Sequence, residues 1–144
     1  MKKATEGWIK FAHDDIYAAE ALLKIDEGLH NIVLFHCQQC LEKILKAVLE
    51  HHGLRVPKTH SLERLINDLP PAVRSASNPD EEFLNLIDDI YISARYPGDL
   101  GLLPTGMPSR EEAEVILIKT RLLFNNFLSI IENSTCDSGQ LESK

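Results

Sequence analysis

Arg95 is the residue of this chain best suited to binding an anion. Its guanidinium is a planar fork that matches two phosphate oxygens. It stands at the end of a predicted helix, just before a segment rich in proline and glycine between residues 97 and 108. Because a long irregular segment in a compact domain is more often functional than idle, we expect Arg95 and the adjacent Tyr96 to contact a phosphate group. In a second interpretation, the cation only stabilises the C-terminal end of its helix dipole.

Lys43, Lys46 and His60 are the other candidates for this ligand site. The two lysines follow Gln39 at positions i+4 and i+7 of a predicted helix, so the three residues share one stripe of its surface. The stripe could lie over the ligand as a basic strip. It could equally be a solvated face, or pair with Asp14 of another helix, and the pattern favours these structural interpretations. His60 precedes a short predicted helix, where it could cap the helix or bind phosphate.

A metal site is not predicted. His36, Cys37 and Cys40 have helical spacing that suggests zinc, but a structural zinc site needs four convergent ligands and no second ligand pair follows. We therefore expect no metal and no cofactor. Three cysteines without an export signal predict reduced thiols and a cytoplasmic protein. No apolar run is long enough to span a membrane.

The net charge of −7 limits how a nucleic acid could be bound. A protein that neutralises many phosphates is expected to carry a basic face. Any nucleotide or RNA site in this chain must therefore be local and built from few cations.

Apolar residues at helical spacing predict the elements that position these candidates. Long helices are expected over residues 5–27, 31–52, 78–96 and 109–132, and a short one over 61–69. Asn78 and Pro79 read as the start of the fourth helix, and Ser109 with Glu112 as a capping box for the fifth. The sequence thus predicts an all-α, up-and-down bundle of four long helices plus one short helix. We expect one domain over residues 1–133 and a disordered tail over 134–144.

Strict alternation of these five helices would bring several candidates to one end of the bundle. That end would hold Arg95 and Tyr96 together with His60, His51 and His52.

The last predicted helix carries a second apolar stripe. Val115, Ile118 and Leu122 lie almost opposite its core face when projected at 100° per residue. The other helices could cover this stripe. We favour a subunit interface, because small bundles readily form two-fold dimers.

Four segments in this order resemble one family, the HEPN domain family. They are WIKFAHD at residues 8–14, QQCLEKILKA at 38–47, THSL at 59–62 and ARYP at 94–97. The resemblance implies a dimeric helical bundle, often encoded beside a minimal nucleotidyltransferase. It also implies, for a large subset, a metal-independent RNase with an Arg-x(4–6)-His motif, in which the Arg stabilises phosphate charge and the His transfers protons.

The chain departs from that RNase motif, because no histidine follows Arg95. We therefore expect a module that binds a nucleotide or RNA phosphate as partner of a minimal nucleotidyltransferase in a toxin–antitoxin type system. One alternative is an RNase toxin that uses Arg95, Tyr96 and His60 in a degenerate site. Another alternative is a protein-interaction domain without a ligand.

Overall fold

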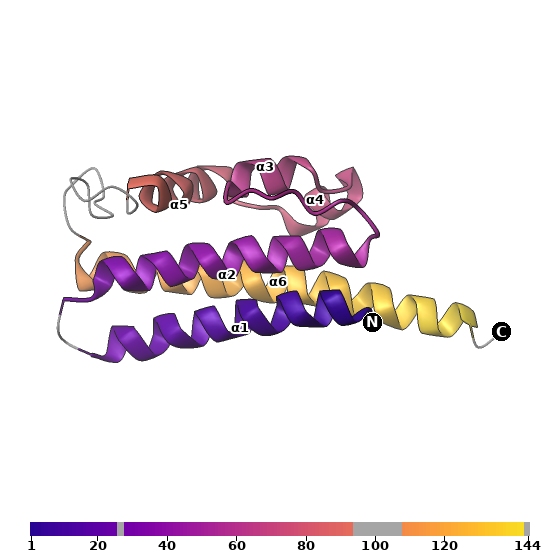
Figure 1. The fold of residues 1–144 in the computed structure, drawn as a ribbon, viewed down its shortest axis with the longest axis horizontal. Coiled ribbons are helices and arrows are strands. Elements are labelled where there is room, and N and C mark those ends of the chain that lie inside the picture. Colours follow the sequence, from indigo (N-terminus) through magenta and orange to yellow (C-terminus); the bar gives the residue numbers. More distant parts are fainter. Residues whose placement is uncertain (26–27, 94–107, 143–144) are drawn as a thin grey trace.

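The computed structural model of the chain describes residues 1–25, 28–93 and 108–142 (Figure 1). These residues form six α-helices and no strand, which confirms the all-α prediction. The helices are α1 (Lys3–Lys24), α2 (His30–His51), α3 (Leu62–Asn67), α4 (Pro71–Ser77), α5 (Glu81–Ser93) and α6 (Arg110–Glu142). No helix in the described ranges is long and apolar enough to cross a membrane.

Helix α2 is the centre of the bundle. In Figure 1 it lies between α1 on one side and α3, α4 and α5 on the other, with α6 behind it. The apolar residues at helical spacing on its core side are fully buried: Leu34, Cys37, Leu41, Ile44, Leu45 and Val48. Each Leu or Ile that is withdrawn from water in this way contributes about 1.5–3 kcal/mol. The core-facing apolar residues of α1 and α6 are buried too, except that Trp8 of α1 is only partly covered.

Local sequence signals explain several helix ends. At the start of α6, the Glu112 amide donates to Ser109 Oγ and the Ser109 amide donates to Glu112 Oε1, both at 3.1 Å, so the predicted capping box is confirmed. At the end of α2, Gly53 has a φ of +70°. Its amide bonds to the carbonyl of Glu50, and the Leu54 amide bonds to that of Leu49. This pair of bonds is the Schellman motif, which needs a left-handed residue that glycine adopts without strain.

The predicted start of the fourth helix is wrong. Asn78 has a φ of 44° and ends α4 instead of opening α5. The residue that caps α5 is Asp80, whose Oδ1 accepts from the Phe83 amide at 3.1 Å. Helix α4, which lies between the short predicted helix and the fourth one, was not predicted. Proline suits the first turn of a helix, where its missing N–H is not needed, and Pro71 begins α4.

The predicted gathering of helix ends is wrong as well. His30 at the start of α2 bonds through Nδ1 to the carbonyl of Pro108, just before α6, at 3.3 Å. Lys2 instead bonds to the carbonyl of Glu50, near the end of α2. The end of α5 and the start of α6 thus lie opposite the end that holds His51 and His52 (Figure 1). The six-residue α3 is only about 9 Å long, so it does not make a full crossing of the bundle.

Helix α6 extends further than predicted. It continues past Glu132 through Glu142, into the segment expected to be a disordered tail. Ser134 Oγ donates to the carbonyl of Ile130 at 2.8 Å within this extension, and no proline interrupts it. The assignment of residues 1–133 to one domain stays a prediction.

Candidate functional site on helix α2

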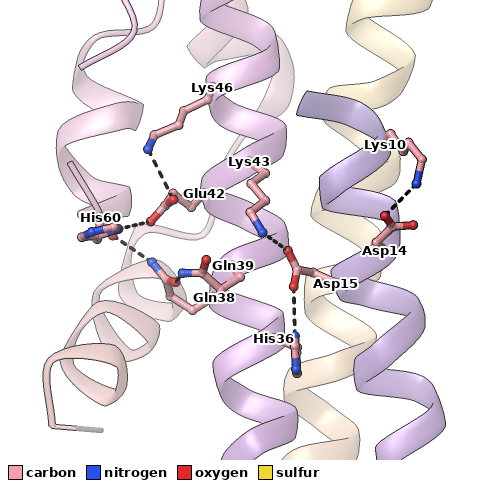
Figure 2. Close-up of polar contacts among 10 residues, drawn as sticks. All are labelled: Lys10, Asp14, Asp15, His36, Gln38, Gln39, Glu42, Lys43, Lys46 and His60. Atoms are coloured by element: carbon pink, nitrogen blue, oxygen red, sulfur yellow. Dashed lines mark hydrogen bonds and ion pairs between the residues drawn. The ribbon is translucent and has the colours of Figure 1, made fainter. Parts of the chain in front are cut away.

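Two networks of polar side chains flank helix α2 (Figure 2). One joins α2 to α1, and the other joins α2 to the segment just before α3. Both are built from the 38–47 segment and its neighbours, where the sequence placed two of its ligand candidates, Lys43 and Lys46.

Asp15 of α1 is the centre of the first network. Its two oxygens accept from Lys43 Nζ at 2.5 Å and bond to His36 Nδ1 at 2.9 Å. The Asp15 side chain is only 11% exposed, so the ion pair lies largely out of water. Asp14, the partner weighed for Lys43 from the sequence, instead pairs with Lys10 on the outside of α1. One residue of difference turns a helical side chain by about 100°, and that rotation decides which acid faces α2.

Glu42 of α2 is the centre of the second network. Its Oε1 bonds to His60 Nδ1 at 2.8 Å, and its Oε2 accepts from Lys46 Nζ at 3.3 Å. The side chain of Glu42 is 5% exposed and that of Lys46 is 9% exposed. Lys46 Nζ also lies 5.4 Å from the centre of the Trp8 ring, where a cation is stabilised by the aromatic face. Gln38 completes the network by donating from Nε2 to the carbonyl of His60 at 2.8 Å.

His60 is thereby held at its backbone and its ring while much of the ring stays open to solvent. Its side chain is 51% exposed, and its ring centre is 5.3 Å from that of Tyr91 on α5. Because a carboxylate can only accept, Nδ1 is the nitrogen that carries the proton in this bond. In the tautomer that carries its proton on Nδ1, Nε2 has a lone pair, and the described residues provide no bond to it.

Asp88 of α5 fixes the start of α3 next to His60. It accepts from the amides of Leu62 at 2.8 Å and Glu63 at 3.1 Å, which α3 leaves without helical partners. Partial burial raises the pKa of the Asp88 carboxyl above its ordinary value, although these hydrogen bonds oppose the increase. No signal in the sequence marks Asp88 as a cap, because it lies within another helix.

Metal chemistry gains no support from the described residues. They contain no group of three or more His, Cys, Asp or Glu side chains placed to hold an ion. Cys37 and Cys40 are buried in the core. Burial raises the pKa of the Cys37 thiol to about 12 and raises that of Cys40 well above its ordinary value. Their burial therefore favours the protonated thiol over the thiolate.

Of the remaining candidate residues, the structure describes those on α6 but not Arg95 and Tyr96. Arg95 and Tyr96 lie outside the described residues. Val115, Ile118 and Leu122 on α6 are 51%, 61% and 59% exposed, so the other helices do not cover this stripe. Its role as an interface stays a prediction.

Comparison with known proteins identifies the family. A model of the HEPN domain family matches residues 5–130, which is most of the chain. The chain belongs to the HEPN domain family.

Individual relatives of this HEPN domain are distant in sequence. It is 30% identical over 96 residues to a protein of Methanocaldococcus jannaschii named "Putative toxin MJ1304", a match that covers 62% of this chain and 61% of that protein. The crystal structure of TT1696 from Thermus thermophilus is similar with a TM-score of 0.73 and 27% identity, covering 90% of this chain and 98% of that one. An archaeal HEPN homologue, ST0689, shares the fold with a TM-score of 0.66 and 24% identity, over 91% of this chain and 99% of that one.

In this HEPN domain, the 38–47 and 59–62 segments meet in the second network. Gln38 and Glu42 come from the first segment, and His60 comes from the other. Lys43 and Lys46 are each matched by a carboxylate, so neither is a free cation. Contact of Lys43, Lys46 and His60 with a ligand stays a prediction. Asp15 and Glu42 were not predicted as partners of the two lysines. The i, i+4 spacing of Glu42 and Lys46 is a sequence signal that could have identified the second pair.

Proposed function

We propose that this HEPN domain is the toxin-type component of a toxin–antitoxin system. In this proposal it binds a nucleotide or an RNA phosphate through Arg95 and Tyr96, and it acts with a minimal nucleotidyltransferase. The observation that carries the proposal is the family match over residues 5–130, together with the toxin-named relative. The ARYP segment at residues 94–97 supports Arg95 as the phosphate ligand.

The charges near the proposed ligand site allow only a few contacts with phosphate. Lys43 and Lys46 are held by Asp15 and Glu42, so they add little positive field. A ligand phosphate would then depend mainly on Arg95, and binding should weaken only gradually as salt is added.

The proposal includes a homodimer formed through α6. Three large apolar side chains on one outer face, Val115, Ile118 and Leu122, are more than half exposed. Their i, i+3, i+7 spacing suits packing against a second helix, and a two-fold pair would bury the same stripe of both subunits.

Expression of the chain with and without its neighbouring reading frame tests the system. Growth arrest is expected with the chain alone and should be relieved by the neighbour, and the two proteins should co-purify.

Arg95→Ala should abolish the arrest and weaken nucleotide binding by about 1.5–3 kcal/mol, while Arg95→Lys should keep only part of the binding. Arg74→Ala is the matched control, since the described pair of the Arg74 side chain is an exposed one with Glu81. Arrest and binding that survive in Arg95→Ala would contradict the proposed ligand role. A chain that binds its neighbour but no nucleotide would be a protein-interaction domain.

A second function, RNA cleavage, has one specific observation in its favour. His60 is a half-exposed imidazole oriented through Nδ1 by the buried Glu42, an arrangement that suits a general base. Its Nε2 would take the proton of a ribose 2′-hydroxyl while that oxygen bonds to the adjacent phosphorus. The P–O5′ bond would break, the 5′-oxygen would take a proton from water, and His60 would return its proton to solvent.

Cleavage is tested with purified protein and single-stranded RNA. Products with a cyclic phosphate and a 5′-hydroxyl are expected from the wild type, and none from His60→Gln. His13→Gln is the control, because His13 lies elsewhere on α1. If the wild type leaves the RNA intact, cleavage is excluded and binding is the function that remains.

A further inference from the structure

A short row of aromatic rings crosses from α2 to the segment before α3. The Phe35 and Tyr91 rings are stacked with centres 6.1 Å apart and planes 16° apart. Tyr91 in turn lies 5.3 Å from His60, with the two planes tilted by 40°. Tyr91 is buried in the middle, while Phe35 is 38% exposed and the His60 side chain is 51% exposed. The row thus ends in an accessible ring on each side.

Phe35 is unusual within α2, whose other large apolar side chains are mostly buried. It shares the outer face with Ile32 one turn earlier, which is 37% exposed, and with Gln39 one turn later. The Gln39 amide uses one N–H to bond to Gln38 Oε1 at 2.7 Å. Within the described residues its own Oε1 and second N–H have no partner. A flat apolar ring therefore lies next to an amide that can both donate and accept.

The charges further along this stripe of α2 indicate what kind of molecule the face would bind. Lys43 is paired with Asp15, and Lys46 is paired with Glu42. Since each lysine is matched by a carboxylate, these described residues add no surplus positive charge that would attract phosphate. A neutral, flat, aromatic group with hydrogen-bonding edges fits it better.

We propose that Phe35 and Gln39 form the binding site for an unpaired nucleobase, with the base stacked on Phe35 and its edge bonded to the Gln39 amide. The base would extend the existing stack of Tyr91 on Phe35. Base–aromatic stacking tolerates any sequence, because every base has a π face, and the amide adds a preference among bases. The site rests on the proposed function, in which the chain binds a nucleotide or RNA.

Equilibrium binding of two labelled oligomers by fluorescence anisotropy tests this site. One is a short oligoadenylate, and the other is an abasic oligomer with the same number of phosphates. The wild type should bind the oligoadenylate roughly 5- to 150-fold more tightly, the range expected for one base–aromatic stack. Phe35→Ala and Phe35→Leu should both reduce that ratio to near one, whereas Phe35→Trp should keep it. The leucine variant retains an apolar side chain without a π face, so it remains informative if the alanine variant is less stable. Tyr17→Ala is the matched control, because Tyr17 is an exposed aromatic on α1 outside this row.

The outcomes separate the two proposals. Equal binding of both oligomers by the wild type would overturn the base site and leave phosphate binding intact. A preference that survives in Phe35→Leu would overturn it as well. A preference lost in Phe35→Leu but unaffected by Arg95→Ala would support the base site and contradict the role of Arg95. If neither oligomer binds, both proposals are overturned, and this face has a protein partner or no partner.

Discussion

Helices α2 and α6 depart from the usual pattern of polar residues outside and apolar residues inside, and they do so in opposite ways. Helix α2 carries charged and amide side chains into the interior, and Gln38, Glu42 and Lys46 all find partners there. Helix α6 carries apolar side chains outward, and Val115, Ile118 and Leu122 remain exposed. A buried charge survives only if it is paired, so the α2 residues are explained within one subunit. An exposed apolar stripe does not stabilise the single subunit, because its surface stays in water. The α6 residues are therefore better explained by contact with a partner.

The strongest test of this contrast is the loss of Glu42. Glu42→Ala should lower the free energy of unfolding by about 3–5 kcal/mol, because it leaves the buried Lys46 ammonium without its carboxylate. Urea unfolding followed by circular dichroism measures the change. Glu114→Ala is the control: Glu114 also forms an i, i+4 pair, with Arg110, but both side chains are at least 40% exposed, so the cost should stay below about 1 kcal/mol. Equal costs for the two variants would show that the α2 network is no more than a surface feature.

The counterpart on α6 is Ile118→Asp. If the stripe is an interface, the wild type should be a dimer and the variant a monomer, because a carboxylate buried in an apolar contact costs several kcal/mol. Light scattering at micromolar protein measures the mass. The unfolding free energy of the isolated subunit should change little, since Ile118 is 61% exposed in it. A wild-type monomer would exclude the dimer, while a variant that remains dimeric would place the interface on another face.

A smaller loss of stability is expected from a change at the start of α6, before the exposed stripe. Ser109→Ala should reduce stability by about 1 kcal/mol, because it removes the side-chain bond to the Glu112 amide. Ser109→Asp should restore most of the loss, since aspartate is an equally good cap. Thermal melts of the two variants, run beside the wild type, separate this local contribution from association through α6. An alanine variant that melts like the wild type would show that the cap contributes nothing.

The smallest effect should come from Asp88. Its pKa is raised in the folded state, so the folded protein holds this proton more tightly than the unfolded chain does. The Asp88 contribution to stability is therefore complete below the ordinary pKa of about 4 and declines as pH rises through the raised value. Asp88→Asn should remove this decline and flatten the dependence of the unfolding free energy on pH above about 4. A pH profile identical to that of the wild type would mean that Asp88 ionises as if it were exposed.

Much of the fold follows from local pattern. The core faces of α2 and α6, the capping box at Ser109 and the stop at Gly53 each depend on residues within one or two turns of one another. Such signals act through backbone geometry and helical spacing, which are present in the chain before it folds. The exposed stripe of α6 is visible in the same way, although its partner is not.

The candidate site depended on contacts between distant segments. Whether Lys43 meets Asp14 or Asp15 depends on how α1 is rotated against α2, and packing of the two apolar faces determines that rotation. The position of α5 depended on how far the chain travels in α3, which is too short to cross the bundle.

The sequence by itself determined which residues could form helices, which faces they would bury, and that few cations were available for an anion. Only the tertiary structure decided that Lys43 and Lys46 are matched by acids, and that His60 is held by Glu42 and Gln38 beside Tyr91. The physical reason is the distance along the sequence over which each interaction acts. Hydrophobic periodicity acts within a few residues, whereas charge pairing and ring contacts depend on which helices the folded core brings together.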